Sequence, residues 1–329
     1  MISIWKQTAE LRQIDKVEPN CWVNVTNPTP AEVQQLISDF SLQAAFVNDV
    51  LDIDERSRME LDENKVMIIL RIPHAKTDQP LPYITLPLGI IITPDHVITI
   101  SLMENDVIND LMNPLRTRSL NIQMKVNFVL DIILRSSIHF LKSLKEINAH
   151  TIEIDRDLKR STQNKELYKL MRIEKCLVYF ITSLKSNELL LAKLEHSKFF
   201  TTNERDEDLL EDAIIESRQA SEMAKIYSDI LSNMMDTIGS IINNNLNTVM
   251  KALTSITIII MIPNLIYSFY GMNINLPIAD HANAYHIILA ISLILSVLGW
   301  FFLFVAEKFR FRKLRQLYRF PFGVKKKAL

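Results

Sequence analysis

Polar and thioether side chains recur at helical spacing through a mainly apolar segment near the C-terminus. We call them the polar series: Asp236, Ser240, Asn243, Asn247, Met250, Thr254, Thr257, Met261, Asn264 and Ser268. The steps alternate between three and four residues, so a helix would carry the whole series on one face. Polar side chains inside a bilayer must face protein or water. The spacing therefore predicts either a helix face that lines a water-filled path or a polar contact between helices.

Two long apolar segments predict membrane spans around this series. Residues 252–270 and 285–306 are each close to the ~20 residues that a bilayer requires. No Lys or Arg occurs between Lys251 and Lys308, whereas the tail that follows Glu307 is basic and carries no acid. The alternative is a buried helical hairpin of a soluble protein, which neither the missing charges nor the basic tail favours.

The charge distribution also predicts an orientation. Positive residues stay on the cytoplasmic side, so the basic tail should lie in the cytoplasm. Two spans form a hairpin, which places residues 1–250 in the cytoplasm as well. Residues 1–20 lack the apolar stretch of a signal peptide. We therefore expect a multi-pass protein of the inner (plasma) membrane with both termini in the cytoplasm.

Glycine and proline divide the rest of the chain. Nine of the twelve prolines lie at or before Pro114, and residues 115–238 contain neither Gly nor Pro. Because these two residues interrupt regular structure, the stretch should be almost entirely helical. Weak helix formers predict breaks near residues 161–164 and 197–203. The expected helices are therefore 121–160, 164–196 and about 203–270.

The N-terminal part predicts a mixed α/β domain. Runs rich in β-branched residues indicate strands at 21–26, 65–72, 86–93 and 96–102. Helices should begin near Thr29-Pro30 and near Ser41, with Thr29 as an N-cap. The predicted domains are thus a cytoplasmic α/β domain at 1–115, a helical hairpin and stalk helix at 116–250, and a two-helix membrane domain at 251–329.

Composition excludes several kinds of function. The net charge is −1, which argues against a nucleic-acid partner. Two cysteines fit a reducing compartment. Only five glycines occur in 329 residues, so a Gly-rich phosphate loop is excluded. No nucleophile elbow, HExxH motif or paired-cysteine ligand motif occurs either, so we do not expect an enzyme.

The assembly follows from the helix lengths. A helix from 203 to 270 would be roughly 100 Å long, and such a length needs partners along it. Two helices of one chain cannot enclose a water path, but several copies could, each contributing one polar face. We therefore expect a homo-oligomer in the lipid bilayer.

The polar series ends at Tyr270-Gly271-Met272-Asn273. This motif, at the end of the first of two C-terminal spans, resembles the signature of the CorA-type magnesium transporter family. The segment 49–56, followed by 65–71, also resembles the helix-then-strand segment of that family. The resemblance covers essentially the whole chain and implies a homopentameric Mg²⁺ channel, with Co²⁺ or Ni²⁺ as possible substitutes. Gly271, Met272 and Asn273 would then form the outer selectivity filter.

The resemblance also assigns roles along the pore. Asp236 and Asn247 correspond to polar rings, and Met250, Leu253 and Met261 to an apolar constriction. Asn264 stands where the family usually has Thr, although an amide still offers a carbonyl to a hydrated ion. Asp280 is the first acid after the motif and lies later than is common in the family. Mg²⁺ dehydrates reluctantly, so amide carbonyls that accept hydrogen bonds from its waters suit it.

The start of the long helix is acidic, and two interpretations remain open. The residues are Glu204, Asp206, Glu207, Asp208, Glu211 and Asp212. Acids at a helix N-terminus are favourable by themselves. The resemblance instead implies a regulatory Mg²⁺ bridge between subunits, with Asp212 and Asp208 on the helix and Asp78 in the neighbouring N-terminal domain.

Two other functions are compatible with the same architecture. One is a Zn²⁺ transporter, which the intact Met272 disfavours because zinc-transporting relatives tend to vary that position. The other is a membrane-anchored helical scaffold without transport, for which Asn273→Ala would leave ion flux unchanged.

Overall fold

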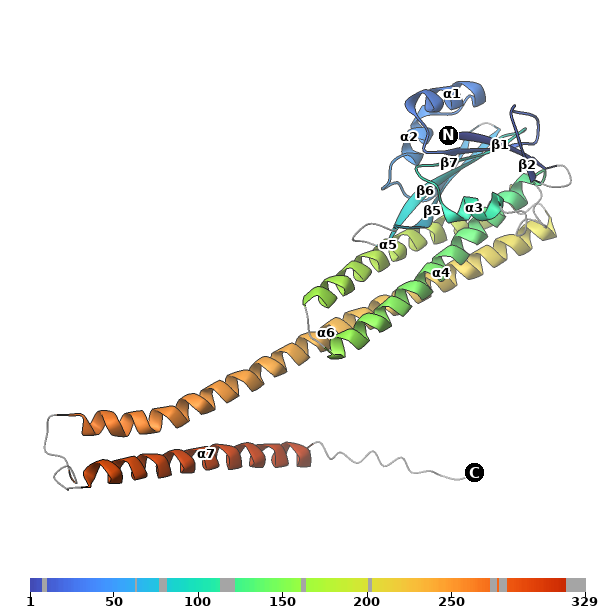
Figure 1. Ribbon diagram of the computed structural model, residues 1–329. Helices are drawn as coiled ribbons and strands as arrows, with labels where there is room; N and C mark the ends of the chain where they lie inside the picture. Colours follow the sequence, from blue (N-terminus) through green and yellow to red (C-terminus); the bar gives the residue numbers. More distant parts are fainter. Residues whose placement is uncertain are drawn as a thin grey trace, which may run out of the picture. The chain divides into compact units, whose positions relative to one another are not determined.

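A computed structural model describes residues 1–7, 11–62, 64–76, 82–112, 122–160, 164–200, 203–272, 277 and 283–317 (Figure 1). The chain divides into two compact units, 1–237 and 238–329. The first unit holds one mixed sheet together with the helices packed on it. The predicted division at about 115 and 250 separates that sheet from its covering helices and stays a prediction.

The first unit is built on one seven-stranded sheet. Its strands are β1 (Ile2–Gln7), β2 (Leu11–Ile14), β3 (Trp22–Thr26), β4 (Arg58–Asp62), β5 (Lys65–Ala75), β6 (Tyr83–Ile92) and β7 (Val97–Ser101). The strand order is β2-β1-β3-β7-β6-β5-β4; among the strand pairs in the described residues, β3–β7 is parallel and the other five are antiparallel. The four predicted strands are confirmed as β3, β5, β6 and β7. Strands β1, β2 and β4 were not predicted.

Helices cover both faces of this sheet, which explains why its central strands are continuously apolar. On one face Met67 and Ile69 of β5 pack in a cluster with Phe46 of helix α2 (Ala44–Val50). On the other face Ile68 and Leu70 join a cluster with residues of the long helices. Alternate side chains of one strand therefore serve two cores.

Short helices begin where local chemistry favours them, with one correction. Helix α1 (Pro30–Phe40) has Thr29 as N-cap and Pro30 in its first turn, and Glu32 completes a capping box. The next helix, predicted to begin near Ser41, begins at Ala44, because Ser41 ends α1 in a left-handed conformation (φ 49°). Helix α2 begins only after Gln43. Helix α3 (Asp106–Met112) was not predicted.

The stretch without Gly or Pro is helical as predicted. It contains α4 (Lys125–Arg160), α5 (Asn164–Glu195) and the first part of α6 (Glu204–Tyr270). Helix α4 begins four residues later than predicted, after a turn at 122–124. In the second unit α6 continues to Tyr270, and α7 (Ala284–Leu317) follows. Pro263 lies inside α6 without ending it.

Candidate functional site

Helix α6 carries every member of the polar series. All ten side chains are exposed in the single chain, from Asp236 to Ser268. The two thioethers are among them, with Met250 exposed over 53% and Met261 over 62% of its surface. The helix therefore presents this face to something outside its own chain.

The opposite face of α6 packs on α7. Within residues 251–270 of α6, the side chains that are not fully exposed are Ser255, Ile259, Ile262, Pro263, Ile266 and Tyr270. One partner on α7 is Gly299, where a built Cβ would lie 2.8 Å from Ile262 Cδ1. At 100° per residue, the mean direction of the polar series lies roughly 150° from that of this contact face. The hairpin contact therefore leaves the polar series uncovered.

Both helices of this hairpin are long and apolar enough to cross a membrane. Almost none of the most apolar stretch is buried within the chain, 0% for α6 and 6% for residues 284–303 of α7. A core hairpin of a soluble protein would be mostly buried. The exposure therefore contradicts that alternative and fits surfaces that lipid or further protein copies cover.

The threonines of the polar series are set to accept hydrogen bonds. Thr254 Oγ1 donates to the Met250 carbonyl over 2.8 Å, and Thr257 Oγ1 donates to the Leu253 carbonyl over 2.9 Å. Each hydroxyl proton is thus used within the helix, and the oxygen lone pairs remain directed outward. Water molecules bound to a cation present their hydrogens outward, so acceptors of this kind match a hydrated cation.

The predicted filter lies at the end of α6. Gly271 N–H donates to the Tyr267 carbonyl over 2.9 Å, and Met272 N–H donates to the Phe269 carbonyl over 3.3 Å. A Cβ at Gly271 would lie 3.3 Å from the Tyr267 carbonyl oxygen, tighter than ordinary contact, which favours glycine here. Met272 is exposed over 52% of its surface. Asn273 and Asp280 lie outside the described residues.

The acidic cluster splits into one inward residue and several outward ones. Asp206 is 3% exposed, and its carboxylate accepts a hydrogen bond from the Asn127 amide of α4. Asp206 N–H donates to Asn203 Oδ1 over 3.0 Å, which caps α6. Burial raises the pKa of Asp206, and the bonds from Asn127 and the Asn203 backbone oppose that rise.

Asp208 and Asp212, the predicted regulatory ligands, are exposed on α6. Among the described residues, no group of three or more His, Cys, Asp or Glu side chains is placed to hold a metal ion. Asp78, the predicted partner, lies outside those residues. One chain therefore supplies carboxylates but no assembled cation site in its described part.

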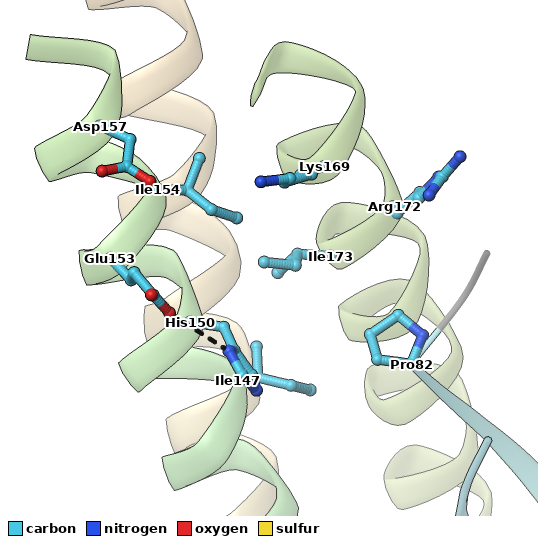
Figure 2. A pocket seen from close by; sticks show the side chains of 9 residues that line it. All are labelled: Pro82, Ile147, His150, Glu153, Ile154, Asp157, Lys169, Arg172 and Ile173. Atoms are coloured by element: carbon cyan, nitrogen blue, oxygen red, sulfur yellow. Dashed lines mark ion pairs between the residues drawn. The ribbon is translucent and has the colours of Figure 1, made fainter. Parts of the chain in front are cut away.

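A cleft of about 350 Å³ opens between α4 and α5 (Figure 2). Glu153 and Asp157 lie on its α4 side, whereas Lys169 and Arg172 lie on its α5 side. Figure 2 also shows the ion pair of Glu153 with His150, whose atoms are 3.8 Å apart. Cationic and anionic walls offset each other, so this cleft is a poor cation site.

Two arginines hold the acidic segment around residues 49–56 in place. Arg58 forms ion pairs with Asp49, Glu55 and Glu60. Arg71 is buried, and its guanidinium donates to the Ile53 carbonyl over 2.5 Å. The three acids thus form structural ion pairs with Arg58. The sequence alone did not reveal this role.

The sequence interpretation also missed a polar contact inside the hairpin. Tyr267 Oη and Ser292 Oγ are 2.8 Å apart, which joins α6 to α7 near the end of the polar series. Tyr267 is not a member of that series, and Ser292 lies in an apolar span, so spacing alone could not pair them.

Comparison with known proteins agrees with this architecture of an α/β domain, a long helix and an exposed apolar hairpin. The family model described as CorA-like Mg²⁺ transporter protein matches residues 18–313. The chain therefore belongs to the CorA-like Mg²⁺ transporter protein family.

Individual relatives carry the same family name. The cobalt/magnesium transport protein CorA of Methanocaldococcus jannaschii is 26% identical over 281 residues, which cover 84% of this chain and 87% of that protein. The protein of the same name from Thermotoga maritima is 21% identical over 286 residues, covering 84% and 80%. The complete structure of the M. jannaschii CorA magnesium transporter superimposes with a TM-score of 0.81 at 23% identity, covering 92% of this chain and 96% of that one.

Proposed function

We propose that this protein is a homopentameric channel for Mg²⁺ uptake across the inner (plasma) membrane, with Co²⁺ and Ni²⁺ as further substrates. The observation that carries the proposal is the exposed polar series on the face of α6 opposite α7. Copies of α6 arranged around an axis would turn this face inward and α7 outward toward lipid. Family membership and the names of the relatives support Mg²⁺ as the ion.

Ion selection is assigned to the end of α6. Gly271, Met272 and Asn273 of each subunit would form the outer ring, where carbonyl oxygens accept hydrogen bonds from the waters around Mg²⁺. Neutral oxygen ligands hold the hydrated ion weakly enough to release it. Asn264 and Ser268 continue the same line of acceptors further along the helix.

Permeation and closure are assigned to the middle of α6. Thr254 and Thr257 supply outward acceptors, and Asp236, Asn243 and Asn247 supply polar rings toward the cytoplasmic side. The apolar side chains Met250, Leu253 and Met261 would close the path by excluding water.

Regulation by cytosolic Mg²⁺ is assigned to the start of α6. Asp212 and Asp208 are exposed, so a carboxylate of a neighbouring subunit, with Asp78 as the predicted residue, can share an ion with them. Bound Mg²⁺ would hold the closed assembly, and its loss would let facing carboxylates repel each other.

Flux measurements on the full-length protein in liposomes test the proposal. Wild type should admit Mg²⁺ above empty liposomes, and Asn273→Ala should lose most of this flux or its preference for Mg²⁺. Asn244→Ala, on α6 but outside the polar series, is the matched control. Equal flux in wild type and Asn273→Ala would contradict the assigned filter. A monomer in the bilayer, or uptake of Zn²⁺ in preference to Mg²⁺, would contradict the channel or its ion.

A further inference from the structure

The donor and the acceptor of the hydrogen bond between the Tyr267 and Ser292 hydroxyls can be assigned. Ser292 Oγ donates its one proton to the Leu289 carbonyl over 2.9 Å, within α7. The Tyr267 hydroxyl must therefore be the donor across the 2.8 Å gap, and Ser292 Oγ the acceptor. The bond thus runs from α6 to an oxygen that α7 itself holds in place.

Ser292 is well fixed as an anchor. It is 2% exposed, the lowest exposure that α7 shows among its described side chains. The Ser296 hydroxyl donates to the Ser292 carbonyl over 2.9 Å, so the backbone there is bonded as well. A buried hydroxyl without its partner is costly in an apolar environment, which favours keeping the Tyr267 contact.

Tyr267 lies next to the residues that the proposed function uses. Ser268, the last member of the polar series, is its direct neighbour. The Tyr267 carbonyl accepts the N–H of Gly271 over 2.9 Å, so the filter segment begins with a bond to Tyr267. A rotation of the last turn of α6 would move Ser268, Tyr267 and Gly271 together.

We propose that Tyr267 is a positioning residue for ion selection: its hydrogen bond to Ser292 fixes the rotation of the last turn of α6 and thereby the placement of Gly271 and Met272, where the proposed filter begins. In this role Tyr267 does not contact the ion and acts through Ser268 and Gly271. The inference rests on the proposed channel function and names the contact that sets the filter geometry.

The Tyr267–Ser292 hydrogen bond constrains the rotation of α6 about its axis more strongly than the apolar contact between α6 and α7 does. Further toward the cytoplasmic end, α6 meets α7 through the apolar contact of Ile262 with Gly299. Apolar contacts are non-directional and permit some rotation, whereas a hydrogen bond constrains it. The Tyr267–Ser292 bond is a polar contact of this kind between the two spans.

Mg²⁺ uptake by the full-length protein in liposomes tests this role, with external Mg²⁺ varied to separate half-saturation from maximal flux. Tyr267→Phe and Ser292→Ala should each raise the half-saturating Mg²⁺ concentration by about three- to tenfold, the range for one lost hydrogen bond. Maximal flux should stay within about twofold of wild type. The double variant should resemble either single variant, because both remove the same bond.

Tyr285→Phe is the matched control, since Tyr285 is exposed over 71% of its surface on the same hairpin. It should keep the wild-type half-saturation. Unchanged half-saturation in both Tyr267→Phe and Ser292→Ala, with a conducting wild type, would overturn the inference and leave the channel function standing. A loss of maximal flux alone would also overturn it, because that result indicates only a structural role. If wild type admits no Mg²⁺, the proposed function and this inference fail together.

Discussion

The side-chain amide of Asn187 in α5 pairs with both backbone polar groups of Arg71 in β5. Asn187 Nδ2 donates to the Arg71 carbonyl over 2.8 Å, and Asn187 Oδ1 accepts from the Arg71 N–H over 3.0 Å. Strand β4 begins at Arg58, which pairs with Ile69 of the antiparallel β5, so residue 71 of β5 lies beyond the last residue that β4 covers. A side chain from a covering helix thus replaces the missing strand.

Replacing this amide should destabilise the first unit. For Asn187→Ala we expect a loss of about 2 kcal/mol, because two buried backbone groups lose their main partner. Ser57 and Ser136 still contact Arg71, which limits the loss. Thermal unfolding of the full-length protein in detergent should show a Tm lower by about 4–8 °C. Thr182→Ala, at an exposed position of the same helix, is the control and should change the Tm little.

A second prediction concerns the pH dependence of stability at Asp206. Its pKa is raised in the folded state, so the folded protein binds this proton more tightly than the unfolded chain does. Its contribution to stability is therefore greatest below the ordinary aspartate pKa and is lost as the pH rises through the raised value. Asp206→Asn should abolish this loss, so its Tm relative to wild type should increase between pH 4 and pH 7.

The exposed neighbour Asp208 provides the control for that measurement. Asp208→Asn removes a carboxylate at the same end of α6 without removing a buried group. Its Tm difference from wild type should not increase over the same pH range. A relative Tm of Asp206→Asn that falls with rising pH would contradict the assignment of a buried, charge-disfavouring environment.

The long helices were predictable because their signal is local. The absence of Gly and Pro, together with weak helix formers at the breaks, placed the end of α4 at Arg160 and the start of α5 at Asn164 correctly. Strands β1, β2 and β4 were missed for the opposite reason. They include charged, partly exposed residues such as Arg58 and Glu60, and only pairing with distant strands makes them regular.

In the candidate site, too, the sequence predicts the features that depend on local spacing but not those that depend on distant partners. Helical period alone predicted that the polar series shares one face, since that property depends only on spacing along α6. The partners of Asp206 and Tyr267 could not be predicted, because Asn127 and Ser292 lie on other helices whose register follows from packing. An acidic cluster in the sequence does not show which of its members is buried.

The regulation proposed for the acidic start of α6 gives a third prediction. Asp212→Asn should make Mg²⁺ influx less sensitive to Mg²⁺ inside the liposomes, because the shared carboxylate ligand is lost. We expect the internal concentration that halves influx to rise about tenfold. Glu216→Gln removes a half-buried acid one turn further along α6 and should behave like wild type. Equal inhibition of wild type and Asp212→Asn would assign the cluster to helix capping alone.

The outward acceptors of the polar series give the last prediction. Thr254→Val keeps the shape of the side chain but removes an oxygen whose lone pairs face away from the helix. Flux of Mg²⁺ should fall about tenfold, since a hydrated ion would lose one ring of hydrogen-bond acceptors. Thr254→Ser keeps the oxygen and should retain most of the flux. Thr248 makes the same bond to a carbonyl four residues earlier, over 2.9 Å, but lies outside the polar series. Thr248→Val should therefore conduct like wild type, and an equal loss in both valine variants would show that helix bonding, not the pore face, determines the flux.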